Sequence, residues 1–239
     1  MNSARIGNYT VFFDNTEEYH KLRREVWGGN LYYVDPEELD ERGVDTSKMT
    51  ILDLGAHIGL STLYFARLFP GARIVSVEPV PENAAFLRKN VFENLLEQVL
   101  ITEVAVSDQD GEGELYVDAS PDRWYSTAGI KRGAWNGEQE SKIINVQTRT
   151  LTSILQEYRP SIVKMDIEGA ETDVIKQAQD EVSGVEIWLI EFHPIEGKGM
   201  EEIVQTFEER GYRVQVTKGG KTVPWHKARG LSLITARKK

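Results

Sequence analysis

The 239-residue sequence contains no cysteine. This absence excludes disulfides, thiolate zinc sites, thiol nucleophiles and iron–sulfur clusters, although it does not identify the compartment. The chain also lacks any run of about 18 apolar residues that could span a bilayer. Its first thirty residues lack the charged-then-apolar layout of a secretory signal and carry acidic residues that a transit peptide avoids. We therefore expect a cytoplasmic protein that is not inserted in a membrane.

Positive charge is scarce, because 28 Lys and Arg residues stand against 38 Asp and Glu residues, a formal net charge of -10. This balance opposes phosphate backbones, and the basic residues are scattered apart from the terminal ARKK, which is typical of a solvated tail. A nucleic-acid substrate is therefore disfavoured. The apolar share of 40% is ordinary for a globular protein with a sizeable core.

Runs of strand length alternate with segments of helical period along the chain. The strand-like runs are residues 51–56, 73–80, 99–107, 161–169 and 186–194. The last two strand-like runs, residues 212–219 and 229–238, resemble a closing antiparallel pair. Alternating strands and helices predict an α/β fold with a mainly parallel sheet covered on both faces, and the length fits one domain over residues 1–239.

Two segments fall outside this alternation. Residues 1–50 resemble a strand plus a helix that carries Trp27, and we expect them to form an N-terminal cap. Residues 118–142 form a polar loop, and a loop longer than about 15 residues in a compact domain is usually a lid, a binding loop or disorder. Its aromatic residues favour the interpretation that the loop is a lid that covers the substrate. They are Trp124, Tyr125 and Trp135.

The segment ILDLGAHIGLS, residues 51–61, ends a predicted strand with Gly55 and Gly59. Glycines there let backbone amides approach a ligand, and the helix that follows suits an anion. The spacing is not G-x-G-x-x-G, since His57 occupies the middle position, and this disfavours a dinucleotide. About twenty residues further on, Glu78 ends the next strand, where a carboxylate can bind both ribose hydroxyls. The pair indicates a nucleoside, with glycine-driven packing as the simpler alternative.

The sequence resembles the FkbM family of S-adenosylmethionine-dependent methyltransferases over roughly residues 50–195. The resemblance rests on the segments DLGAHIGLST, VEPVPENAAFLRKN, EVAVSD with DGEGELYV, and VKMDIEGAE followed by IEFHP. It implies a Rossmann-like, seven-stranded, mainly parallel sheet in the order 3-2-1-4-5-7-6, with the last strand antiparallel and helices on both faces. It also implies methylation of hydroxyl groups in sugars or other natural products of secondary metabolism.

The resemblance further implies which residues bind the cofactor. These are Asp53, Gly55, Ala56, Gly59, Ser61, Glu78, Val106 and Ser107. The first four would surround the methionine part, Ser61 would bind its carboxylate, Glu78 would hold the ribose, and the last two would border the adenine. The simpler alternatives are that Asp53 anchors the loop and that Ser61 caps the helix. His57 is interpreted as a tolerated loop residue.

A hydroxyl acceptor must lose its proton, which calls for a base near the methyl group or for a divalent ion that acidifies the hydroxyl. The fourth and fifth predicted strands offer ionisable groups at their carboxyl ends, and the candidate catalytic residues are His193, Asp166, Lys164 and Glu168. His193 is the first choice for the base, because its unperturbed pKa of ~6.5 lets it accept a proton near pH 7. Asp166 is the second choice for the base.

Metal dependence is open at this point. If a metal binds, Asp166, Glu191 and His193 would suit Mg²⁺ or Mn²⁺, since Glu191 and His193 share a strand face by the period-two rule. The arrangement resembles the magnesium site of catechol-type O-methyltransferases. It departs from that site where Glu191 and His193 replace an acid and amide pair, so a metal is not favoured. For Lys164, the alternative is structural pairing with Asp166 or Glu191.

The leading hypothesis is an S-adenosylmethionine-dependent O-methyltransferase acting on a small hydroxylated metabolite, sugar or natural product. The alternatives are an N-methyltransferase on the same fold and a non-catalytic cofactor-binding module. The N/D-P-P-Y/F type motif of amino-group methylation is absent after the fourth strand. We expect a small-molecule partner, no nucleic-acid or membrane partner, and an arrangement compatible with a homodimer.

Overall fold

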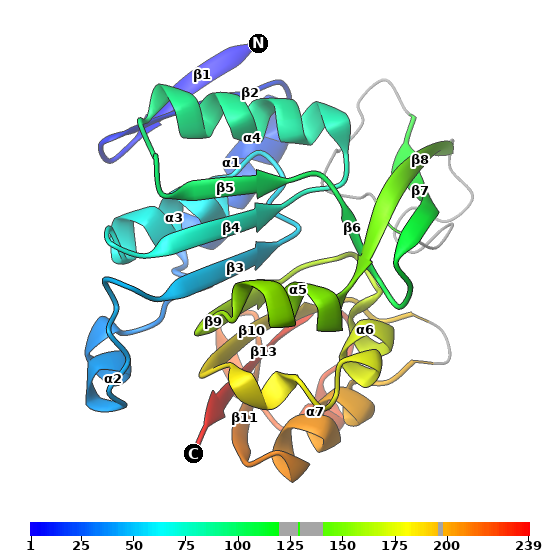
Figure 1. Ribbon diagram of the computed structural model, residues 1–239. Coiled ribbons are helices and arrows are strands. Elements are labelled where there is room, and N and C mark those ends of the chain that lie inside the picture. Colours follow the sequence, from blue (N-terminus) through cyan, green and yellow to red (C-terminus); the bar gives the residue numbers. More distant parts are fainter. Residues whose placement is uncertain (120–128, 130–140, 196–197) are drawn as a thin grey trace.

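A computed structural model describes residues 1–119, 129, 141–195 and 198–239 (Figure 1). Its main sheet has eight strands in the order β12-β11-β13-β10-β9-β3-β4-β5. The bounds are β3 Thr50–Leu54, β4 Arg73–Val77, β5 Val99–Thr102, β9 Ile162–Met165, β10 Ile187–Phe192, β11 Tyr212–Lys218, β12 Lys221–Val223 and β13 Ser232–Lys238. β13 runs antiparallel to both of its neighbours, β10 and β11. Without the short edge strand β12, this is the predicted order 3-2-1-4-5-7-6 with an antiparallel last strand, and the fold prediction is confirmed.

Two apolar cores, one on each face of the sheet, hold the layers together. Leu52 and Leu54 of β3 belong to one core, whereas Ile51 belongs to the other, as strand alternation requires. The first core is covered by α5 Leu151–Tyr158, α6 Glu171–Gln177 and α7 Met200–Glu209. The second is covered by α3 Leu60–Leu68 and by the N-terminal elements, while α4 Pro81–Glu93 packs beside it. Helices therefore lie on both faces, as predicted.

The N-terminal residues form more structure than the expected strand and helix. They comprise β1 Asn2–Ile6, β2 Tyr9–Phe13, α1 Thr16–Arg23, the π-helical turn η1 Arg24–Gly28 and α2 Pro36–Glu41. The expected single strand is a hairpin, because Gly7, at a φ of 57°, reverses the chain between the two paired strands. Trp27 lies in η1, and its ring nitrogen donates to the carbonyl of Leu60 at 3.1 Å. This contact ties the N-terminal segment to the start of α3.

The run expected as one strand over residues 99–107 is two strands in different sheets. β5 ends at Thr102 in the main sheet, whereas β6 Ala105–Ser107 pairs with β8 Ser141–Thr150, which also pairs with β7 Gly111–Asp118. The split has a physical reason, because Ala105, Leu115 and Val146 bury their side chains in a small core of their own. The predicted lid, residues 118–142, lies largely outside the described residues, and so do Trp124, Tyr125 and Trp135.

Two short 3-10 turns, η3 Val182–Gly184 and η4 Trp225–Lys227, complete the elements assigned in the described residues. Among the helices of those residues, none has the length and apolar character needed to cross a membrane.

Candidate active site

The turn between β3 and α3 is pressed against the chain that follows β9. Gly55 has a φ of 73°, and a β-carbon at this position would lie 1.8 Å from the carbonyl oxygen of Asp166. Only glycine fits there without moving the backbone. The N–H groups of Gly55 and Ala56 both donate to the carbonyl of Val77, at 2.9 and 3.0 Å. The glycine thus allows close packing of the backbone, the simpler alternative, and its contacts join the turn to the ends of β4 and β9. The approach of these amides to a ligand stays a prediction.

Asp53 is the centre of a buried polar network behind this turn. Its Oδ2 accepts hydrogen bonds from the hydroxyls of Ser61 and Thr62, both at 2.7 Å. Its Oδ1 lies 3.3 Å from Nζ of Lys164. The network holds the start of α3 against β3, which matches the simpler alternative that Asp53 anchors the loop.

Lys164, a predicted catalytic residue, is bonded to backbone carbonyls and paired with carboxylates. Its ammonium donates to the carbonyls of Leu54 at 3.2 Å and Gly55 at 2.6 Å, and it lies closer to Asp53 than to Asp166, which is 3.7 Å away. Burial alone would lower the pKa of Lys164, but the charges of Asp53 and Asp166 outweigh that effect and raise the pKa. A buried lysine that stays charged and fully bonded fits a structural role, with Asp53 as a partner that the sequence did not indicate.

Glu78 stands just past the end of β4, with its carboxylate buried. Oε2 accepts a hydrogen bond from the backbone N–H of His57 at 2.8 Å, and Oε1 accepts from the N–H of Val80 at 3.0 Å and the amide of Asn83 at 3.1 Å. Burial raises the pKa of Glu78, although His57 and these hydrogen bonds act against the rise. Since a carboxylate accepts about four hydrogen bonds, Oε2 keeps room for another donor.

A recess runs along the carboxyl ends of β4, β3 and β9, which are neighbours in the sheet. It encloses about 620 Å³ of empty space, part of which is open to solvent. Five of the residues predicted for the site line it. These are Gly55, Glu78, Val106, Asp166 and Glu168.

The other predicted cofactor residues are not part of this lining. Ser107 lines a second, smaller recess that also touches Glu168. Asp53 and Ser61 lie in the network behind the turn. Ala56 is buried, and a β-carbon at Gly59 would meet Leu87 of α4 at 2.7 Å, so Gly59 allows close packing of two helices. Asp53 and Ser61 therefore support the turn without lining the recess.

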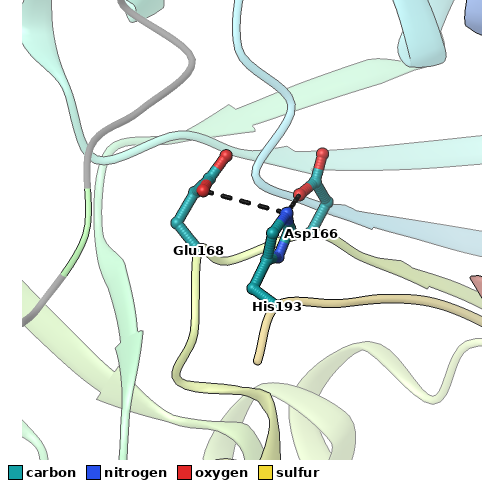
Figure 2. A group of neighbouring side chains, drawn as sticks. All are labelled: Asp166, Glu168 and His193. Atoms are coloured by element: carbon teal, nitrogen blue, oxygen red, sulfur yellow. Dashed lines mark ion pairs between the residues drawn. The ribbon is translucent and has the colours of Figure 1, made fainter. Parts of the chain in front are cut away.

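Asp166, Glu168 and His193 come together at the carboxyl ends of β9 and β10 (Figure 2). His193 Nε2 lies 3.8 Å from Asp166 Oδ1 and 3.8 Å from Glu168 Oε2. On the other side of the ring, Nδ1 lies 3.0 Å from Oε1 of the buried Glu171. Within the part of the chain that the structure describes, the facing oxygens of Asp166 and Glu168 accept no hydrogen bond. The cluster is therefore rich in negative charge and poor in donors.

The electrostatics of this cluster change the argument for His193 as a base. Burial lowers the pKa of His193, but the hydrogen bond to Glu171 and the charges of Asp166 and Glu168 outweigh it and raise the pKa to about 10. The expectation of an ordinary histidine that is neutral near pH 7 is therefore wrong. Burial, with the charge of Asp166, raises the pKa of Glu168 well above its usual value.

Glu191 does not join His193 as the period-two rule predicted. β10 ends at Phe192, so strand alternation does not extend to His193. The carboxylate of Glu191 instead accepts a hydrogen bond from the hydroxyl of Tyr32 at 2.6 Å. Burial and the charge of Asp166 raise its pKa to about 7. In the described residues, the second carboxylate of the cluster comes from Glu168 and not from Glu191.

The sequence model of the Methyltransferase FkbM domain matches residues 53–214, which is more than half of the chain. The chain belongs to the FkbM methyltransferase family. The glycine turn, Glu78, the carboxylate–histidine cluster and most of the main sheet all lie within the matched FkbM segment.

Several curated relatives of this FkbM-family chain are named methyltransferases. Methyltransferase sdnD of Sordaria araneosa is 29% identical over 157 residues, covering 55% of this chain and 61% of the relative. Methyltransferase 1 of Beauveria bassiana is 26% identical over 186 residues, covering 69% of each. The 2-O-methyltransferase NoeI of Sinorhizobium fredii is 29% identical over 136 residues, covering 52% of this chain and 55% of the relative. The matched segments thus span between 55% and 69% of these relatives.

Sequence reasoning missed several contributors to this site, on three different helices among others. Leu22 of α1 and Asn83 of α4 line the recess, and Glu171 of α6 orients His193. Asn83 had a local signal, since it follows Glu78 in the segment VEPVPEN. Leu22 had none, because only the packing of the N-terminal segment brings it to the turn.

Proposed function

We propose that this FkbM-family chain is an S-adenosylmethionine-dependent O-methyltransferase that acts on a hydroxyl group of a small metabolite, sugar or natural product. The observation that carries the proposal is the recess. It joins Glu78, a buried carboxylate with acceptor capacity left, to Asp166 and Glu168 across the Gly55 turn. In this proposal the nucleoside of the cofactor lies toward Glu78, and the methyl group faces the carboxylates beyond β9.

The chemistry follows from that orientation. The acceptor oxygen forms a bond to the methyl carbon while the carbon–sulfur bond breaks, and both electrons of that bond stay on sulfur. The hydroxyl proton passes to a carboxylate of the cluster. Asp166 is the proposed acceptor of the proton, because it lines the recess whereas His193 lies behind it and is 5% exposed. Positioning supplies much of the rate, and the base contributes about 10²- to 10⁴-fold.

A hydroxyl acceptor is favoured by the name of one relative, the 2-O-methyltransferase NoeI. The net charge of -10 favours a small molecule over nucleic acid. The direct test incubates the protein with S-adenosylmethionine and a panel of hydroxylated and amine-bearing small molecules, and follows S-adenosylhomocysteine and the methylated product. Methylation of amines alone would replace the proposal with N-methylation, and cofactor binding without any turnover across the panel would favour a binding module.

Calorimetry tests the cofactor separately. We expect S-adenosylhomocysteine to bind to the protein and NAD to give no heat, because the glycine spacing does not suit a pyrophosphate. A preference for NAD would contradict the cofactor assignment, whatever the acceptor is.

Glu78→Gln is expected to weaken S-adenosylhomocysteine binding by about 5- to 150-fold, since a hydrogen bond to a charged, buried group is worth about 1 to 3 kcal/mol. Glutamine keeps one acceptor oxygen for Val80 and Asn83, so the start of α4 should stay intact. The matched control is Glu93→Gln at the other end of the same helix, where the carboxylate is 41% exposed. Equal affinity for the Glu78 variant and the wild type would remove Glu78 from the ribose role.

A further inference from the structure

The carboxylate–histidine cluster has the geometry of an ion site more than that of a hydrogen-bonded network. The two distances of 3.8 Å from His193 Nε2 to Asp166 and Glu168 exceed the usual limit of about 3.2 Å for a hydrogen bond. One ligand atom from each residue lies within 4.8 Å of the other two. Ligands bound at about 2.1 Å to one octahedral ion lie about 3 Å apart when adjacent and about 4.2 Å apart when opposite. Small side-chain rotations would therefore bring all three atoms onto one ion.

The carboxylates of the cluster also favour a bound ion. Asp166 Oδ1 and Glu168 Oε2 are shielded from solvent and accept no hydrogen bond in the described part of the chain. Burying carboxylate oxygens that accept no hydrogen bond is costly, and a metal ion placed between them would offset that cost. Lys164 lies 3.7 Å from Asp166, but it is already bonded to Asp53 and to two backbone carbonyls.

The position of the histidine is an independent observation. Glu171 is 1% exposed, and its Oε1 faces Nδ1 of His193 while also accepting the N–H of Gly169 at 3.0 Å. This contact directs the opposite ring nitrogen, Nε2, toward Asp166 and Glu168 (Figure 2). A carboxylate on the second ring nitrogen is the usual support of a metal-binding histidine.

Glu168 carries a further sign of a specialised position. Its backbone has a φ of 57°, a conformation that non-glycine residues seldom adopt and that strained functional residues often show. The turn lies between the end of β9 and the start of α6, and there the side chain of Glu168 points toward His193 (Figure 2).

We propose that Asp166, Glu168 and His193 bind one divalent cation of the Mg²⁺ or Mn²⁺ class at the wall of the recess. Two carboxylates and one imidazole leave open positions on a six-coordinate ion, and oxygen-rich sets suit these ions. Asp166 and Glu168 line the recess, so a hydroxyl of the acceptor can take an open position.

The catalytic use of the ion rests on the proposed methyl transfer, whereas its binding does not. A hydroxyl bound to the ion becomes more acidic. Its proton still passes to a carboxylate oxygen of the cluster that is not coordinated, and the ion orients the oxygen toward the methyl group.

The test titrates the full chain, stripped with EDTA and dialysed, with MnCl₂ in the absence of cofactor and acceptor. Paramagnetic resonance of free Mn²⁺ and calorimetry both report binding. We expect one site, and we expect Asp166→Asn and Glu168→Gln each to weaken Mn²⁺ binding by at least about tenfold. Glu191→Gln is the matched control, because it removes a neighbouring carboxylate outside the proposed set, and it should change the affinity by less than about threefold. Circular dichroism and thermal unfolding verify that each variant folds.

Absence of Mn²⁺ binding at millimolar concentration would overturn the proposal. So would an affinity that is unchanged in both ligand variants, or one that falls most in Glu191→Gln. Binding of S-adenosylhomocysteine in the presence of EDTA separates the two proposals. If the chain binds Mn²⁺ but not S-adenosylhomocysteine, the ion site stands and the proposed function fails. If it binds S-adenosylhomocysteine but not Mn²⁺, the proposed function stands and the ion site fails.

Discussion

Replacing Asp166 with asparagine is expected to lower kcat by about 10²- to 10⁴-fold, the usual contribution of a positioned base. Asparagine preserves the shape of the side chain but can neither accept the hydroxyl proton nor supply a negative charge to the cluster. The backbone carbonyl that meets Gly55 is unchanged, so the affinity for S-adenosylhomocysteine should stay within about threefold. The measurement combines steady-state kinetics on the acceptor found in the screen with calorimetry of the cofactor product.

Asp180→Asn is the matched control for this substitution, because the side chain of Asp180 is 87% exposed and contacts only Arg210 among the ion pairs of the described residues. It should leave kcat unchanged. His193→Ala, measured in parallel, decides between the two predicted bases. A larger loss in the His193 variant than in Asp166→Asn would move the base role to His193, and near-normal turnover of Asp166→Asn would remove Asp166 from the reaction.

Lys164→Met is expected to lower the free energy of unfolding by about 3 to 5 kcal/mol, the usual result of removing one partner of a buried ion pair. Methionine fills a similar volume but leaves the carboxylate of Asp53, which is fully buried, without its counter-charge. Chemical denaturation with urea measures the change, and a lower midpoint with an unchanged slope would show that stability alone has moved.

Two further variants make that result interpretable. Lys176→Met removes a lysine that is 74% exposed and 3.6 Å from Glu202, and such surface pairs contribute about 0 to 1 kcal/mol. The double variant Asp53→Asn with Lys164→Met should recover part of the lost stability, because the uncompensated charge is gone. A loss below about 1 kcal/mol in Lys164→Met would contradict the structural role assigned to the pair.

The parts of the site that the sequence predicts are those in which a local pattern determines the geometry. The Gly55 turn and Glu78 follow directly from the ends of two adjacent parallel strands, and both line the recess where they were expected. The sheet order was predicted from the family resemblance. The strand pairing in the structure confirms that order.

The failures have a common cause, because a periodic rule was carried past the end of its element. Alternation paired Glu191 with His193, yet β10 stops at Phe192 and His193 lies beyond it. The same applies to the run at 99–107, where the chain leaves one sheet for another after Thr102. The positive φ of Glu168, which places it in the cluster, has no counterpart in any side-chain pattern.

The contact between Gly55 and the Asp166 carbonyl also limits how this site can be redesigned. Any side chain at position 55 would displace the backbone of Asp166, so a change on one side of this contact disturbs the other side. Changes of acceptor preference therefore belong at Leu22, which lines the same recess from α1 and takes no part in this contact.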